Sequence, residues 1–283
     1  MHSSILKLFN SAIFIISLLF CFPVSAGLDE GLDAIDAKNF EIAYRELLPQ
    51  AKLGHTIAQY NIGLLYNLGE WVDQDFDEAF KWYRKSAEQG YARAQNNLGT
   101  LYAKGEGVQQ NHSKAAMWYK KAASQGQVDA QYSLGEKYRE GKGVQQSLSD
   151  AVLWYKKAAN QGHIYAQNNL GVMYAKGKGA QQNHSKAAKW YLEAARQGHV
   201  KAQFTMAMYY AEAIGVPYNE TESVKWLELA ALGDHVTAQE LLGGLYLLGE
   251  FFPKNLVKAK IWFKKVCDNG SQKSCNVIVT LEN

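Results

Sequence analysis

Histidine is the side chain that most often supplies a general base or a metal ligand near neutral pH. Six histidines follow residue 26 of this 283-residue chain, and none belongs to a His-Glu-x-x-His string, which would place two zinc ligands on one helix face. No carboxylate recurs beside them at a fixed spacing. They stand at His55, His112, His163, His184, His199 and His235. The pattern therefore predicts no catalytic histidine and no metal site.

Serine and glycine motifs also lack the context that chemistry needs. An acyl-enzyme mechanism commonly uses Ser-x-x-Lys with a Lys-Thr-Gly elsewhere, but the chain has this spacing only at Ser4 and Lys7 and has no Lys-Thr-Gly. Gly-x-Gly pairs begin at Gly105, Gly141 and Gly177. Phosphate-binding loops follow strands or lead into Lys-Ser/Thr, whereas these pairs follow helical segments. We interpret them as turns and expect no catalytic residue and no cofactor.

The elements that must position all these residues recur every 36 positions. Six tryptophans keep this step: Trp82, Trp118, Trp154, Trp190, Trp226 and Trp262. An Ala-Gln pair keeps the same step, with its glutamine at Gln59, Gln95, Gln131, Gln167, Gln203 and Gln239. Such a period predicts an all-α solenoid of stacked units and favours binding over catalysis.

One unit is a helix–turn–helix. Apolar residues at helical spacing occupy residues 93–102 and again residues 114–123, and Gly105 and Gly107 interrupt them. Small residues such as Gly99 are expected to let helices approach closely. A good N-cap recurs before each second helix, at Asp75, Asn111, Ser147, Asn183, Asn219 and Asn255.

The repeats have recognisable ends. We expect N-terminal capping helices at residues 27–53 and a C-terminal capping helix at 271–283, flanking six repeats at about 54–89, 90–125, 126–161, 162–197, 198–233 and 234–270. The fifth departs most, since Ala207 replaces a glycine and Leu227 a tyrosine. The sixth has an apolar loop at Phe251 and Phe252. These two units are expected to bend the solenoid or to present an apolar patch.

Residues 1–26 have the layout of a secretory signal peptide. Lys7 is their only charge, residues 12–22 are almost wholly apolar, and Val-Ser-Ala at 24–26 suits a signal peptidase. The alternatives are an uncleaved membrane anchor and a lipoprotein site at Cys21, although a bulky phenylalanine precedes that cysteine. We predict cleavage after residue 26, export, and no membrane span afterwards.

The cleaved chain would carry little net charge. It keeps 29 basic and 27 acidic residues, a net charge of +2. Its lysines are spread over the repeats, which is typical of soluble helix surfaces. Because nothing here attracts a polyanion, we expect no nucleic-acid partner.

The repeated string Ala-Gln-x-x-Leu-Gly-x-x-Tyr-x-x-Gly-x-Gly-Val, followed by Lys-Ala-x-x-Trp-Tyr-x-Lys-Ala-Ala-x-Gln-Gly, resembles the Sel1-like repeat, a relative of the tetratricopeptide repeat. The resemblance covers about residues 54–275. It implies an α/α solenoid wound as a right-handed superhelix, with the first helix of each pair on the concave face. Such proteins usually act as scaffolds for protein assembly, and exported bacterial members include envelope regulators and secreted factors that act on host cells.

The resemblance also bears on the last two cysteines. Cysteine-rich secreted members of this family pair cysteines at the slots of Cys267 and Cys275, so the resemblance implies a disulfide here, which would pin the short final helix. The alternatives are two unpaired cysteines or a metal site, for which no third ligand is nearby.

The variable positions of the first helices are our candidates for partner binding. Asparagines and aromatic side chains among them suit an extended peptide, through amide hydrogen bonds and apolar anchors. They are Tyr60, Asn61, Leu64, Asn96, Asn97, Thr100, Tyr132, Ser133, Glu136, Asn168, Asn169, Val172, Phe204, Thr205 and Met208. The alternative is an ordinary solvated helix face.

Three functions follow from these features. The first is an exported interaction scaffold, periplasmic or secreted, that binds a bacterial envelope protein or a host protein, as a virulence or host-entry factor would. The second is a periplasmic regulator of a membrane sensor or a cell-wall enzyme. The third is a hydrolase of β-lactams or cell-wall material, which the motifs above do not support.

Overall fold

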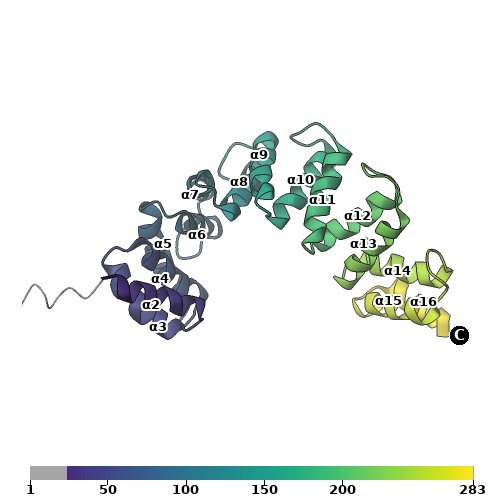
Figure 1. Ribbon diagram of the computed structural model, residues 1–283, viewed down its shortest axis with the longest axis horizontal. Helices are drawn as coiled ribbons and strands as arrows, with labels where there is room; N and C mark the ends of the chain where they lie inside the picture. The colour runs from purple at the N-terminus through teal and green to yellow at the C-terminus, as the bar shows by residue number, and fades with distance from the viewer. Residues whose placement is uncertain (1–23, 283) are drawn as a thin grey trace, which may run out of the picture. The chain divides into compact units, whose positions relative to one another are not determined.

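The computed structural model describes residues 24–282, which form fifteen helices and no strand (Figure 1). The helices fall into two compact units, Met1–Gln127 and Val128–Asn283. Unit 1 contains α2 (Val24–Asp36), α3 (Phe40–Lys52), α4 (Thr56–Leu68), α5 (Phe76–Glu88), α6 (Ala92–Lys104) and α7 (His112–Ser124). Unit 2 contains α8 (Val128–Glu140), α9 (Leu148–Asn160), α10 (Ile164–Lys176), α11 (His184–Arg196), α12 (Val200–Ala211), α13 (Glu220–Leu232), α14 (Val236–Leu248), α15 (Leu256–Asp268) and α16 (Gln272–Glu282).

The predicted caps begin the second helix of every pair. Each of the six side chains accepts the backbone N–H three residues further on, as Asn111 does from Lys114 at 2.9 Å. Several first helices end at a glycine in the left-handed region, for example Gly105 at φ 82° and Gly177 at φ 64°. The prediction that the Gly-x-Gly pairs are turns is therefore confirmed.

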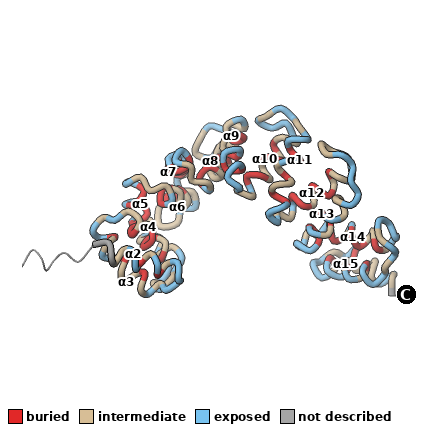
Figure 2. Tube along the Cα trace, viewed as in Figure 1, coloured by how far each residue is buried: buried red, intermediate tan, exposed pale blue. Residues whose placement is uncertain are grey.

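A glycine lies close against an aromatic ring in every repeat except the fifth. A Cβ added to Gly171 of α10 would lie 2.7 Å from the Tyr191 ring of α11, and one added to Gly99 would lie 2.9 Å from Tyr119. Buried residues collect where helices pack against each other in this way (Figure 2). In the fifth repeat Ala207 and Leu227 occupy the equivalent slots, and both are buried. Compared with the glycine and aromatic ring of the other repeats, the larger alanine on α12 is thus matched by a smaller leucine on α13.

The glutamines of the Ala-Gln pairs join successive repeats. Gln95 is buried and donates to the Ala87 carbonyl at 3.1 Å, while its own oxygen accepts from Gln125 at 2.8 Å. The same arrangement recurs in unit 2 around Gln167, which accepts from Gln197 at 2.7 Å. Burying an amide costs little when all its hydrogen bonds are made, so the glutamine both fits the core and fixes the register of the next pair.

Helices also lie on both sides of the six repeats. α2 and α3 stand where the N-terminal capping helices are predicted, and α16 stands at the predicted C-terminal cap. A disulfide joins Cys267 of α15 to Cys275 of α16, with Cα atoms 4.8 Å apart. The predicted signal peptide lies outside the described residues, apart from the three that begin α2. Among the described helices, none has the length and apolar character that crossing a bilayer requires.

Candidate partner-binding face

The candidate residues lie on the first helices of five pairs, α4 and α6 in unit 1 and α8, α10 and α12 in unit 2. Fourteen of the fifteen are half-buried, so each keeps part of its side chain accessible beside a neighbouring helix. Asn61 differs, since it is only 6% exposed and its amide donates to the Ile57 carbonyl at 2.9 Å. Its side chain is used within the core and is not available to a partner. We call the other fourteen the helix-one residues.

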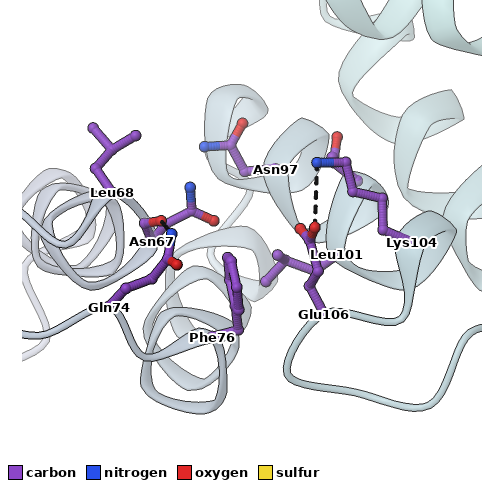
Figure 3. Close-up of a pocket in the computed structure, with 9 residues that line it drawn as sticks. Asn67, Leu68, Gln74, Phe76, Asn97, Leu101, Lys104 and Glu106 are labelled. Carbon is purple, nitrogen blue, oxygen red and sulfur yellow. Dashed lines mark hydrogen bonds and ion pairs between the residues drawn. The ribbon is translucent and has the colours of Figure 1, made fainter.

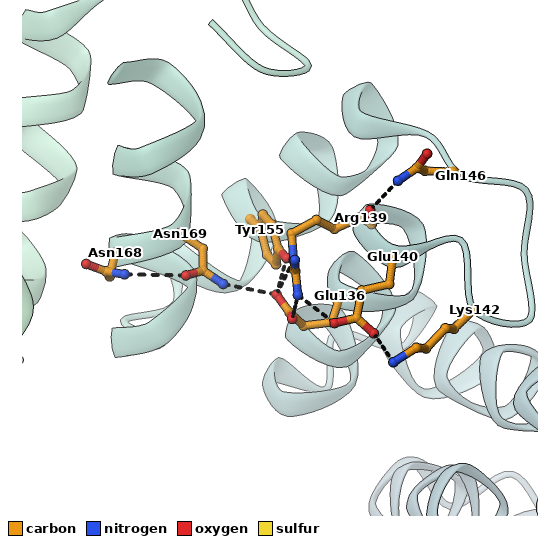
Figure 4. Close-up of polar contacts among 8 residues, drawn as sticks. All are labelled: Glu136, Arg139, Glu140, Lys142, Gln146, Tyr155, Asn168 and Asn169. Atoms are coloured by element: carbon orange, nitrogen blue, oxygen red, sulfur yellow. Dashed lines mark hydrogen bonds and ion pairs between the residues drawn. The ribbon is translucent and has the colours of Figure 1, made fainter. Parts of the chain in front are cut away.

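A polar network organises the helix-one residues of unit 2 around the Glu136 carboxylate (Figure 4). Arg139 donates to it from Nε at 3.2 Å and from Nη2 at 2.5 Å, and Asn169 donates from the next repeat at 3.0 Å. The Tyr155 hydroxyl donates to the same carboxylate. Asn168 in turn donates to the Asn169 oxygen at 3.4 Å. The network therefore fixes α8, α9 and α10 relative to one another and orients both asparagine amides.

The surroundings of this network shift the pKa of two of its groups, Tyr155 and Glu140. Burial, with the Glu136 carboxylate second, raises the pKa of the Tyr155 hydroxyl, which therefore stays a donor. The hydrogen bond from Lys142 lowers the pKa of Glu140, which also accepts from Arg139 at 2.6 Å. Charges here are paired on the protein itself, so the network holds its side chains in place.

Aromatic side chains continue along the same helices. Tyr132 stacks on His163 with ring centroids 4.5 Å apart, and Phe204 stacks on His235 at 4.3 Å. Tyr165 meets His199 edge-on at 5.6 Å and is 56% exposed. Flat, partly exposed rings of this kind are frequent anchors at protein interfaces.

The histidines in these three ring pairs cap helices, a role that was not predicted from the sequence. Nδ1 of His163, His199 and His235 accepts the backbone N–H three residues later, at 3.2, 3.2 and 3.3 Å. An accepting Nδ1 carries no proton, so the neutral ring has its hydrogen on Nε2. Burial lowers the pKa of all three rings, in agreement with this state. Their position directly before each first helix is the sequence feature from which this capping role could have been predicted.

Two hollows open beside helix-one residues. In unit 1, one of about 310 Å³ lies between the α4 end and α6 and is lined by Asn67, Phe76, Asn97 and Thr100, with a Lys104–Glu106 ion pair of 3.4 Å at its rim (Figure 3). In unit 2, a hollow of about 460 Å³ lies between α10 and α12. It is lined by Ile164, Tyr165, Asn168, Asn169, Gly198, His199, Val200 and Lys201.

The hollows suit a peptide better than a metal or a small reactive substrate. Both combine amide groups, aromatic rings and a lysine, but the first lies towards the C-terminal ends of α4 and α6 and the second at the N-terminal starts of α10 and α12. Within residues 24–282 no three His, Cys, Asp or Glu side chains are grouped so that they could hold a metal ion. Tyr165, His199 and Lys201 also line the second hollow, although none of them was among the residues predicted for partner binding.

Comparison with known proteins identifies the repeat. The Sel1 repeat model matches six consecutive segments, at residues 56–91, 92–127, 128–163, 164–199, 200–235 and 236–271. The chain belongs to the Sel1-repeat family. The matched segments follow the 36-residue period and begin two residues later than the repeats drawn from the sequence.

Solved Sel1 structures agree with this assignment. The structure of a protective antigen present in uropathogenic Escherichia coli strains is 34% identical, with a TM-score of 0.85, and the match covers 91% of this chain and 56% of the antigen. This chain thus spans a little over half the length of that protein. A Sel1 repeat protein from Oxalobacter formigenes is 35% identical over 85% of this chain and 96% of its own, with a TM-score of 0.73. Among curated proteins, none matches this chain.

Proposed function

We propose that this protein is an exported scaffold whose helix-one residues bind an extended segment of a partner protein. Sel1 repeats typically mediate protein–protein interaction and generally form non-enzymatic scaffolds. The observation that carries the proposal is the Glu136 network beside the hollow between α10 and α12. It holds the amides of Asn168 and Asn169 in place before any partner arrives, and preorganisation of this kind lowers the entropic cost of binding.

The protein would recognise the partner segment through the backbone and the apolar side chains of that segment. Asn168 donates one N–H within the network, and its oxygen points away from the network (Figure 4). A free amide oxygen of this kind suits a backbone N–H of an extended chain. Tyr165, more than half exposed at the edge of the same hollow, offers an apolar surface beside it.

Export is supported by the N-terminal sequence and by the disulfide. Residues 1–26 have the charge and apolar pattern of a signal peptide, and disulfides such as Cys267–Cys275 persist in oxidising compartments. The E. coli relative is described as a protective antigen. We therefore favour a role at the bacterial envelope or outside the cell, as a virulence or host-entry factor. A periplasmic regulator of a membrane sensor or cell-wall enzyme is the second candidate.

Fractionation of the producing cells tests where the protein is located. Mass spectrometry of the recovered protein should show an N-terminus at residue 27. Protein in the medium or on host membranes supports the first role, and periplasmic retention with one stoichiometric envelope partner supports the second. A cytoplasmic protein that keeps residues 1–26 would contradict export.

Affinity purification tests the binding face. A double variant, Tyr165→Ala with Asn168→Ala, changes accessible atoms and leaves the Glu136 carboxylate in place. Met117→Ala, on an exposed position of a second helix, is the matched control. We expect the double variant to lose a partner that the control retains. Partners bound equally by both variants would move the interface away from the helix-one residues.

A further inference from the structure

An apolar groove lies at the end of unit 2, between α14 and α16. Two adjoining hollows of about 270 and 620 Å³ form it, and Lys273 and Val277 of α16 line both. Leu241 and Leu247 come from α14, and Phe263 of α15 lines the smaller hollow. We call this the C-terminal groove. None of its residues is among the helix-one residues, so the inference below does not depend on the proposed function.

The groove is hollow because one side chain is missing. Gly244 occupies the slot that Leu64, Thr100, Glu136, Val172 and Met208 fill in the other repeats, each 36 residues apart. A Cβ added to Gly244 would meet no atom within 4 Å, whereas one added to the neighbouring Gly243 would lie 3.2 Å from the Phe263 ring. The space beside Gly244 is therefore open to a side chain from outside the protein.

One charge in the groove lacks a counter-ion. Lys273 is exposed and forms no ion pair with the described side chains. The acid in the same hollow, Glu240, lies 3.4 Å from each of the Ser271 and Ser274 hydroxyls, which donate to it. Lys273 is also in the first turn of α16, where the helix dipole favours an anion. Glu240 keeps its charge and is held by the two hydroxyls, whereas the Lys273 ammonium has no partner among the described side chains and is the charge that a ligand would complement.

The length of the groove limits what can fill it. Its α14 wall runs from Thr237 to Leu247, and the ten helical steps between these residues span about 15 Å. An extended peptide of about four to five residues spans that distance. Because the ammonium belongs to the first turn of α16 and the remaining wall is mostly apolar, a chain terminus fits better than the middle of a longer segment.

We propose that the C-terminal groove binds the carboxyl-terminal residues of a partner protein, with the terminal carboxylate at Lys273 and apolar side chains against Leu241, Val277 and Leu247. The Cys267–Cys275 disulfide holds α16, which forms one wall, against α15. Binding therefore also depends on the oxidised state of this pair.

Fluorescence anisotropy with the purified protein tests the proposal. The probe is a dye-labelled library of pentapeptides with randomised apolar residues and a free carboxyl terminus, and its amidated twin is the control ligand. We expect saturable binding of the free acids, at least about tenfold weaker for the amides. The variant Lys273→Met should bind the free acids more weakly by the same factor, while Lys264→Met on the exposed side of α15 should bind them with unchanged affinity.

A filling variant separates binding from folding. Gly244 lines the smaller hollow, and a Cβ added to it meets no atom within 4 Å, so Gly244→Leu should fill the groove and abolish binding while thermal stability is unchanged or higher. Equal affinity for acids and amides, full binding by Lys273→Met, full binding by Gly244→Leu, or no binding of any pentapeptide would each overturn the proposal.

Discussion

The contact between glycine and tyrosine in the first four repeats makes a quantitative prediction about stability. In unit 2 the change Gly171→Ala adds a methyl 2.7 Å from the Tyr191 ring, which is only 5% exposed. Carbon atoms normally sit about 3.5–4.0 Å apart, so the ring or the helix must move by about 1 Å. Overpacking of this kind costs about 1–3 kcal/mol.

A second glycine of the same unit supplies the matched control. Gly244 is also inside a helix, but its added methyl would meet no atom within 4 Å. Glycine to alanine in a helix interior is worth about 1 kcal/mol in intrinsic propensity, and that gain is common to both variants. We therefore expect Gly244→Ala to stabilise by up to about 1 kcal/mol and Gly171→Ala to fall about 1–3 kcal/mol below it.

The fifth repeat indicates how the clash is relieved. There Ala207 occupies the glycine slot and Leu227 the tyrosine slot. In a Tyr191→Leu background, Gly171→Ala should therefore become neutral or stabilising, and the double-mutant cycle should show a coupling of about 1 kcal/mol or more. Urea unfolding followed by circular dichroism measures all four proteins. Equal effects of the two glycine substitutions, or strict additivity in the cycle, would refute the packing account.

Three further predictions concern the caps, the disulfide and pH. Asn183→Ala removes the N-cap of α11 and should cost about 1 kcal/mol in urea unfolding, with Asn183→Ser close to wild type; equal loss in both would argue against capping. Removing the Cys267–Cys275 bond by a double serine variant should cost about 2–3 kcal/mol, and hydrogen exchange should speed up first in α16; uniform acceleration across unit 2 would contradict a local role. Burial lowers the pKa of His199, so the unfolded chain binds more protons than the folded one as pH falls below about 6.5. Its stabilising contribution is present above that pH and is lost as pH falls through the folded-state pKa. His199→Asn keeps a cap without titrating, so its melting temperature should fall less than that of wild type between pH 7 and pH 5; identical pH profiles would exclude the cap as the cause.

Features that recur with the repeat could be predicted from the sequence. The 36-residue period shows which residues occupy equivalent positions of the repeat. The helix pairs, the six N-caps and the close approach at Gly99 can then each be predicted from the residue types that recur at one position. The second-helix core follows in the same way, since Trp118 and Tyr119 are buried as predicted.

Features that depend on one repeat alone could not be predicted. The Glu136 network needs Arg139, whose slot holds alanine in both neighbouring repeats. Tyr155 recurs as Tyr119, but the hydroxyl of Tyr119 meets that of Thr100 at 3.1 Å, where the third repeat has the Glu136 carboxylate. Asn61 and Asn97 share a slot, yet only Asn61 is buried, because burial is decided by the neighbouring side chains. The space beside Gly244 likewise results from a missing side chain, and it can be recognised only when the positions of the surrounding helices are known.

Site-specific photocrosslinking in the producing cells tests the central claim most directly. A photoreactive phenylalanine derivative is placed at Asn168, among the helix-one residues, or at Leu153, which is 49% exposed on the second helix α9. The account predicts a discrete crosslinked protein from position 168, lost when Tyr165 is also changed to alanine, and none from position 153. Crosslinks from position 153 alone, or the same products from both positions, would contradict a partner bound by the first helices.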